Sequence, residues 1–190
     1  RFPVDWYLYR RYEECTQWEK YVGKHFPNEV IPKKKKERNK FKKEVEPTLL
    51  EDPEFLVLHE EFRTKISLAV KLVNQAIEKD LPFETVLFDS WYLAPELIDV
   101  LNEHDKKWIS ILKTNRNIST NNLRILDDKG QKIVFRDKKI KAEDLLKVIP
   151  SSAFKATEIG KKTYYCFSKN VHIASLGKVR LVFSFENPEL

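Results

Sequence analysis

The sequence predicts an α/β protein whose second part is rich in β-strands. Two observations support this. Between residues 62 and 114, apolar segments with helical spacing alternate with short apolar strands, and the connections between them are brief. Beyond residue 119, alternating apolar and polar runs are separated by turn residues, which is typical of an antiparallel meander. We find no internal repeat.

The N-terminal part carries weaker signals. Residues 2 to 9 alternate aromatic and smaller side chains, which favours an edge or hairpin strand. From Tyr12 to Pro53 there is no sustained period, and four prolines interrupt the chain, namely Pro27, Pro32, Pro47 and Pro53. We interpret this stretch as an extended connection.

The middle of the chain predicts a parallel pair of strands. Apolar residues on one helical face predict a helix from about Phe62 to Ile77, which Pro82 would end. A strand over 85–88 follows, with an apolar run typical of a strand covered on both faces. A helix from about Pro95 to His104 then leads to a strand over 107–113. Connections this short imply parallel strands joined by a crossover helix.

The remaining segments predict the antiparallel part. A Lys129-Gly130 turn between two alternating runs predicts a hairpin over 123–135, and a short helix should follow from Ala142 to Lys147. Three strands are expected over 162–168, 171–176 and 178–185, separated by Lys169-Asn170 and by Gly177.

The composition limits the class of protein. With 190 residues, 42% hydrophobic and 34% charged, the chain resembles an ordinary globular protein, and it has no apolar run near the ~18 residues that a membrane helix needs. No signal peptide is recognisable, so we expect a cytoplasmic location and no membrane partner. Two distant cysteines and four scattered histidines argue against a disulfide framework and a zinc site. The absence of methionine leads us to interpret the chain as a fragment.

The charge is unevenly distributed. The net charge is +6, and eight of the eleven residues in "KKKKERNKFKK", residues 33 to 43, are Lys or Arg. Such a block forms either a solvated loop or an arm that contacts phosphates. On the second interpretation the DNA contacts would be Lys33, Lys34, Lys35, Lys36 and Arg38.

Asp89 stands where an apolar strand meets a turn in "FETVLFDSWYLAP". Ligands of open α/β sheets bind at the carboxyl ends of strands, so Asp89 is either a ligand or a turn-forming residue. We favour a ligand, because the next helix is expected to open near Leu93, too far away for Asp89 to cap it. Two other classes of enzyme do not fit. A haloacid-type phosphatase would need a second aspartate at the position of Trp91. A restriction-type nuclease would need a Glu-x-Lys motif on the next strand, where only the lysine, Lys113, is present.

The segments "VLFDSWYLAPELIDVL", "WISILKTNR" and "WYLYRRY" together resemble the catalytic core of DDE transposases from prokaryotic insertion sequences, in the branch with a β-strand insertion. The resemblance implies a ribonuclease H-like mixed sheet in which Asp, Asp and Glu hold two Mg²⁺ or Mn²⁺ ions for cutting and joining DNA. Asp89, followed by Ser90 and Tyr92, matches the second aspartate, so the resemblance makes it a catalytic metal ligand.

Two of the three family carboxylates have no match. Asp5 does not fit the first aspartate, and the Tyr, Arg, Glu pattern of the third is absent. The resemblance therefore implies a fragment, inactive alone, with a partial core over 1–118, a basic connection over 27–53 and a β-rich insertion over 119–190. The parent protein would bind transposon ends and target DNA, and it could form oligomers.

Other residues near Asp89 have two interpretations each. Trp91 and Tyr92 could stack on unpaired bases or pack on the sheet. Lys113, Asn115 and Arg116 leave the neighbouring strand and could contact phosphates or remain solvated. Two functions compete with the transposase: a non-catalytic nucleic-acid-binding module and an unrelated metal-dependent nuclease.

Overall fold

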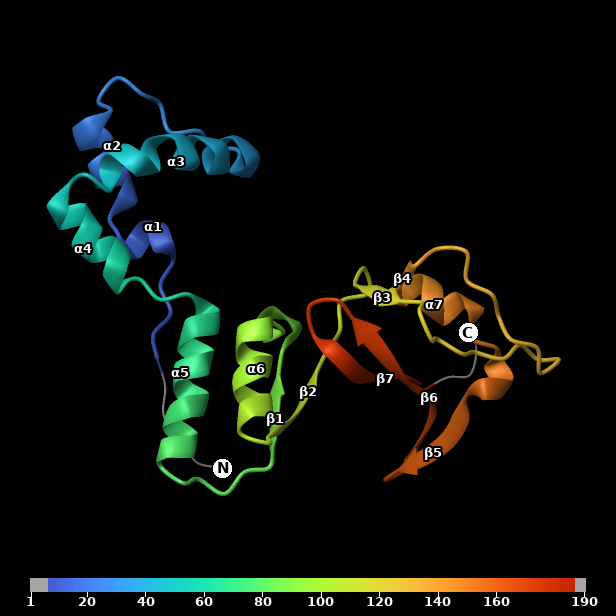
Figure 1. Cartoon of the computed structure of the whole chain (residues 1–190). Coiled ribbons are helices and arrows are strands. Elements are labelled where there is room, and N and C mark those ends of the chain that lie inside the picture. The colour runs from blue at the N-terminus through green and yellow to red at the C-terminus, as the bar shows by residue number, and fades with distance from the viewer. Residues whose placement is uncertain (1–6, 187–190) are drawn as a thin grey trace. The chain divides into compact units, whose positions relative to one another are not determined.

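The computed structural model describes residues 7–186. The chain forms two compact units, which we call the helical unit, Arg1–Pro82, and the α/β unit, Phe83–Leu190 (Figure 1). The domain boundary expected from the sequence, between residues 118 and 119, falls within the second unit. No helix in the described part is long and apolar enough to cross a membrane.

The helical unit contains five helices in the part that the structure describes. They are α1 (Tyr12–Cys15), α2 (Trp18–His25), α3 (Lys35–Leu49), α4 (Pro53–Glu61) and α5 (Lys65–Glu78). The prediction of an extended connection from Tyr12 to Pro53 was therefore wrong, and of the two interpretations of the basic block the solvated loop was wrong for residues 35–43, which are helical. Proline does not prevent these helices, since Pro53 is at the first turn of α4, where no amide hydrogen is needed, and Pro47 lies in the last turn of α3.

Aromatic and aliphatic side chains from three helices form the core of the helical unit. Its buried members are Trp18, Tyr21 and Val22 of α2, Val45 and Leu49 of α3, and Phe55 of α4. Tyr21 and Val22 lie three and four residues after Trp18, and Leu49 lies four residues after Val45, so in α2 and in α3 the buried positions share one face. The many lysines of α3 concealed this period in the sequence.

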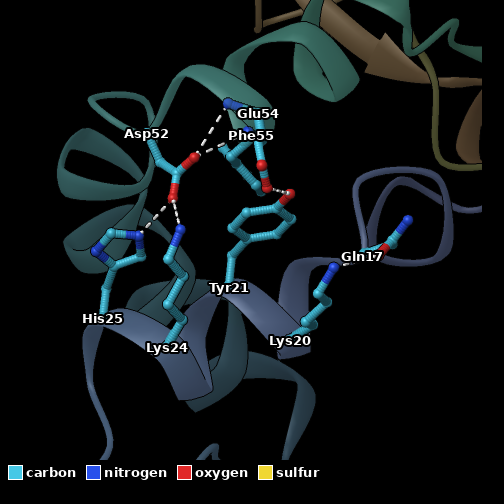
Figure 2. A network of polar contacts seen from close by, with 8 residues as sticks. All are labelled: Gln17, Lys20, Tyr21, Lys24, His25, Asp52, Glu54 and Phe55. Carbon is cyan, nitrogen blue, oxygen red and sulfur yellow. Dashed lines mark hydrogen bonds and ion pairs between the residues drawn. The ribbon is translucent and has the colours of Figure 1, made fainter.

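An ionic contact joins the end of α2 to the beginning of α4 (Figure 2). Asp52 caps α4, because its Oδ1 accepts hydrogen bonds from the backbone N of Glu54 at 3.0 Å and of Phe55 at 3.4 Å. Its Oδ2 lies 2.6 Å from Lys24 Nζ and 2.8 Å from His25 Nε2. The side chain is 5% exposed, and the hydrogen bonds from Lys24 and then His25 hold the pKa of Asp52 well below its usual range.

The segment before α1 is not a strand where it is described. Residues 7 to 11 have no regular secondary structure, so the strand predicted over 2–9 was wrong for residues 7–9, and residues 1–6 lie outside the described range. Tyr7 explains the difference, since its hydroxyl accepts a hydrogen bond of 2.7 Å from Gln75 Nε2 and its ring lies 4.6 Å from Lys71 Nζ. The segment contacts α5 through side chains, whereas a strand would form backbone hydrogen bonds with a neighbouring strand.

Helix α5 confirms the helix predicted from Phe62 to Ile77, with a start that is three residues later. Thr64 caps it by accepting a hydrogen bond of 3.0 Å from the backbone N of Ser67. No residue of α5 is fully buried, so its apolar face is only half covered.

The α/β unit begins with the predicted parallel pair. Strands β1 (Thr85–Phe88) and β2 (Lys107–Ser110) are parallel, with Thr85 opposite Lys107 and Phe88 opposite Ser110. The short 3₁₀ helix η1 (Ser90–Tyr92) and helix α6 (Pro95–Glu103) connect them. This confirms the predicted order and direction, although β2 ends three residues earlier than expected.

Only one face of this pair is covered. Phe88 and Trp108 pack into the core with α6, whose buried residues are Leu97, Ile98 and Leu101. Leu87 and Ile109 lie opposite each other on the other face and are 74% and 60% exposed. The expectation that both faces of β1 are covered was therefore wrong.

The rest of the unit is an antiparallel sheet, as predicted. Its strands are β3 (Asn117–Ser119), β4 (Lys139–Lys141), β5 (Lys155–Ile159), β6 (Lys162–Ile173) and β7 (Gly177–Phe185). They follow the order β4-β3-β6-β5, and β7 also pairs with β6. Helix α7 (Ala142–Val148) confirms the predicted short helix, and a 3₁₀ turn, η2 (Ser151–Ala153), comes after it.

Two turns differ from the prediction. Lys169 and Asn170 lie inside the continuous strand β6, because β7 pairs with it from Tyr165 to Ile173. The predicted hairpin over 123–135 is reduced to one bridge, between Leu126 and Lys132. A turn next to Gly177 is confirmed, but it occupies residues 174–176, which were predicted as strand, and Gly177, with a φ of +73°, opens β7.

One core joins the two parts of the α/β unit. Leu93 and Ile98, next to and within α6, are buried together with Ile118 of β3, Leu145 of α7 and Val171 of β6. The loops that leave the carboxyl ends of β1 and β2 are therefore fixed against the antiparallel sheet.

Candidate functional site

Asp89 follows the last residue of β1 and has an exposed side chain. Its Oδ1 accepts hydrogen bonds from the backbone N of Trp91 at 3.2 Å and from Ser90 Oγ at 2.9 Å. Asp89 thereby caps η1. The argument that Asp89 lies too far from a helix to cap one was wrong, since a 3₁₀ turn that the sequence did not predict begins at Ser90.

Capping uses only part of the carboxylate. Within the described residues, Asp89 Oδ2 accepts no hydrogen bond, and no Lys, Arg or His forms an ion pair with Asp89. The negative charge is thus held at a fixed position by the cap but is not neutralised. Such an oxygen can accept a hydrogen bond or coordinate a hard cation.

Trp91 and Tyr92 lie beside this carboxylate in η1. The Trp91 side chain is 69% exposed, and Lys113 Nζ lies 4.7 Å from the centre of its ring. Tyr92 is half-buried. The structure therefore brings Trp91 and Lys113 together on the exposed rim, where an aromatic ring and a cation are both accessible.

Asn115 and Arg116 come from the loop after β2. Arg116 donates to Ser175 Oγ at 3.3 Å and to the Leu93 carbonyl at 3.5 Å, so it links the loop before α6 to the turn between β6 and β7. Asn115 is exposed. Lys113 and Asn115 thus present polar groups to solvent, whereas the Arg116 guanidinium has partners inside the unit.

The basic residues expected to contact DNA belong to the helical unit. Lys33 to Lys36 are all exposed, at and just before the N-terminus of α3, and Lys34 makes one long contact of 3.6 Å with Glu37. The N-terminus of a helix carries positive partial charge, so four lysines there raise an already positive potential. This concentration of charge favours an anionic partner.

Arg38 is in a different situation from these lysines. Its Nη2 lies 2.5 Å from Glu13 Oε2 and 2.6 Å from Glu19 Oε1, and its guanidinium covers the Trp18 ring at 5.2 Å. The hydrogen bond from Arg38 lowers the pKa of Glu13. Arg38 therefore joins α1, α2 and α3, and its charge is balanced by two carboxylates.

The described residues supply only part of a metal site. In the range 7–186, no three His, Cys, Asp or Glu residues are gathered closely enough to hold a metal ion. Mg²⁺ demands six oxygen ligands, often including water, and a pair of ions needs shared carboxylates. Asp89 fits such an ion as one ligand, with Oδ2 as the donor atom.

A cavity in the helical unit was not indicated by the sequence. It has a volume of about 300 Å³, and its lining combines apolar side chains with two arginines and a glutamate. The lining residues come from the segment before α1, from α1, from α4, from the connection between α4 and α5, and from α5. No local pattern could have identified a site assembled from segments this far apart.

Comparison with known proteins adds no relative, because no protein-family model, curated protein or solved structure matches the chain.

Proposed function

We propose that the chain is part of the catalytic domain of a DDE transposase, whose parent protein cuts and joins DNA at insertion-sequence ends by metal-dependent phosphoryl transfer. The two parallel strands with α6 between them would belong to a ribonuclease H-like core. The antiparallel sheet that follows would be the β-strand insertion.

One observation carries this proposal. Asp89 lies at the carboxyl end of a parallel strand, with its carboxylate exposed, one oxygen fixed by the cap and the charge unneutralised by any described residue. A metal-binding carboxylate needs this combination of fixed position and available charge. An aspartate that served only as a cap would need the fixed position but not the available charge.

The residues around Asp89 suit a nucleic-acid substrate. Trp91 offers an exposed ring, and Lys113 places a cation 4.7 Å from its centre. Aromatic stacking on an unpaired base contributes roughly 1–3 kcal/mol per base, and lysine contacts with phosphate add affinity that depends on salt. In the proposed function Asp89 supplies one ligand to Mg²⁺, and the parent protein supplies the other carboxylates.

Asp89→Asn provides the sharpest test, because asparagine caps helices as well as aspartate does but carries no charge. In the parent protein, Mg²⁺-dependent cleavage of insertion-sequence-end DNA should fall at least 100-fold in Asp89→Asn, while DNA binding should remain within twofold. Equal cleavage by the wild type and this variant would refute the role of Asp89.

The chain itself allows a second test. Mn²⁺ bound at Asp89 should broaden the amide NMR signals of Ser90 and Trp91, and Asp89→Asn should abolish the broadening. Broadening that persists in Asp89→Asn would show that the ion binds elsewhere.

A non-catalytic nucleic-acid-binding module is the second candidate. It is favoured by the exposed lysines at the N-terminus of α3 and by the lack of a three-residue metal cluster in the described part of the chain. Both functions predict salt-dependent DNA binding that weakens when Lys33 to Lys36 are replaced by alanine. The two functions differ in DNA cleavage: the parent protein of a transposase cleaves DNA, whereas a binding module does not cleave it under any condition.

Replacing Lys129, Lys132, Lys138 and Lys139 by alanine is the matched control for this DNA-binding test. These four lysines are also exposed, and their loss changes the net charge equally. A larger loss of affinity and of salt dependence for the Lys33 to Lys36 variant would support a specific contact. Equal losses would show that only net charge matters.

A further inference from the structure

The cavity of about 300 Å³ lies entirely within the helical unit. Its apolar lining consists of Leu8, Leu58, Phe62 and Leu68, and the thiol of Cys15 also borders it. The volume is at the lower end of the range for small-ligand pockets, about 300–1,000 Å³. It therefore suits a compact group such as one aromatic ring system.

The aromatic residue of the cavity lining, Phe62, packs against a side chain that is itself hydrogen-bonded. Phe62 lies edge to face with Tyr12, with 5.1 Å between ring centres. The Tyr12 hydroxyl donates to Glu46 Oε1 at 2.7 Å and lies 2.9 Å from His59 Nδ1. Because these contacts fix the Phe62 ring before any ligand arrives, binding costs little side-chain entropy.

Charged side chains also line the cavity. The side chains of Arg10 and Glu61 form no ion pair or hydrogen bond with any other residue from 7 to 186, and both residues are exposed. Arg63 donates through Nη1 to the carbonyls of Glu60 and Phe62, which leaves its other nitrogens without a hydrogen bond in the described structure. The cavity thus combines two cations with one carboxylate, and their charges are not balanced by neighbours.

We infer that this cavity binds a single unpaired nucleotide, with the base against Phe62 and the phosphate at Arg10 and Arg63. Arginine pairs well with phosphate because it offers several donors in a planar arrangement. Glu61 can accept a hydrogen bond from the exocyclic amino group of a base, as carboxylates do with cytosine N4. The cavity should therefore prefer cytosine and adenine to thymine, which has no amino group.

An acyl chain with a carboxylate suits the cavity less well. It would bring no hydrogen-bond donor to Glu61, and its carboxylate would carry the same sign of charge as Glu61. The inference rests on the proposed nucleic-acid-binding function, and it adds a site and a base preference to that function.

Cys15 provides a direct measurement, because a bound nucleotide should shield its thiol. In Cys166→Ser, which leaves Cys15 as the one cysteine of the sequence, the rate of modification by a thiol-specific reagent can be followed with and without ligand. We expect 5 mM dCMP or dAMP to slow the modification at least fivefold, and dTMP to slow it less than twofold. Inorganic phosphate and laurate should leave the rate unchanged.

Two pairs of variants test separately the phosphate contact of Arg10 and the base preference set by Glu61. Arg10→Ala should weaken protection by dCMP at least threefold, whereas Arg11→Ala, which removes the same charge from the adjacent residue outside the cavity lining, should not. Glu61→Gln should reduce the preference for dCMP over dTMP, whereas Glu60→Gln should preserve it. Circular dichroism of each variant verifies that the helices remain folded.

The outcomes distinguish this inference from the function on which it rests. If no nucleotide protects Cys15, the cavity is not a nucleotide site, even where Lys33 to Lys36 still mediate DNA binding. If laurate protects and nucleotides do not, the inference is also refuted. Protection by dCMP in a chain that fails to bind DNA would support the cavity and refute the proposed function.

Discussion

Asp52 in the helical unit and Asp89 in the α/β unit have the same local role but different surroundings. Each stands at the N-terminus of a helix and accepts a hydrogen bond through Oδ1 from the backbone two residues ahead. Asp52 is 5% exposed, and its Oδ2 contacts Lys24 and His25. Asp89 is exposed, and no ion pair to it exists among residues 7–186.

The difference shows how one side chain can serve stability or function. A capping carboxylate whose second oxygen pairs with a lysine stabilises the fold and has no charge left for a ligand. A capping carboxylate whose second oxygen faces solvent contributes little to stability and keeps its charge. The four predictions below test this contrast in order of decreasing effect.

Asp52→Ala should cause the largest loss of stability, because it removes the cap of α4 and leaves Lys24 and His25 without their shared carboxylate. We expect the Tm of the chain to fall by roughly 5–10 °C, measured by circular dichroism at pH 7. A fall of less than about 2 °C would mean that Asp52 is no more important than an exposed cap.

Asp52→Asn should keep the cap and remove only the charge. The pKa of Asp52 is lowered in the folded state, so its ionised form stabilises the protein above the ordinary carboxyl pKa of about 4, and this contribution is lost as the pH falls below that value. The Tm of Asp52→Asn should therefore lie below that of the wild type at pH 7, and the difference should narrow steadily as the pH is lowered from about 4 to 2.5. Glu51→Gln, an exposed neighbour, is the control and should show no such convergence.

Lys24→Met should have an intermediate effect, because Asp52 keeps its cap and its contact with His25. Lys20→Met is the matched control, since Lys20 and Lys24 lie 5.3 Å and 5.6 Å from the Tyr21 ring, but only Lys24 pairs with Asp52. We expect Lys24→Met to lower the Tm by several degrees and Lys20→Met to leave it nearly unchanged. Equal changes would assign the effect to the Tyr21 contact.

Asp89→Ala should have the smallest effect on stability. It removes the cap of a single 3₁₀ turn, so the free energy of unfolding in urea should fall by only about 0.5 kcal/mol. Asp89→Asn should restore the wild-type value, because asparagine also caps. A loss above about 2 kcal/mol for either variant would indicate a structural role comparable to that of Asp52.

Local patterns were sufficient where one period governed a whole element. The helical spacing in α5, the short apolar run of β1 and Pro95 at the start of α6 each gave the correct element, and alternation gave the correct type for β6 and β7. Connection lengths then predicted that β1 and β2 are parallel. Asp89 was placed at a strand end for the same local reason.

The helices between Tyr12 and Glu61 escaped prediction because their evidence is not local. Only Val45 and Leu49 are buried in α3, and they become a recognisable face when Trp18 and Phe55 pack against them. Likewise, the Lys169-Asn170 pair stays within β6 because a long partner strand supplies its hydrogen bonds. Tertiary contacts outweigh the weak turn preference of two residues.

The sequence by itself determined which residue types stand at the ends of the elements, including an aspartate after β1 and lysines at the beginning of α3. Only the tertiary structure decided which of these charges are neutralised. Arg38 pairs with Glu13, 25 residues away, Asp52 pairs with Lys24, 28 residues away, and Arg116 reaches Ser175, 59 residues away. Ionic and hydrogen-bonding energies depend on distances of a few ångströms, which packing fixes and the order of residues does not.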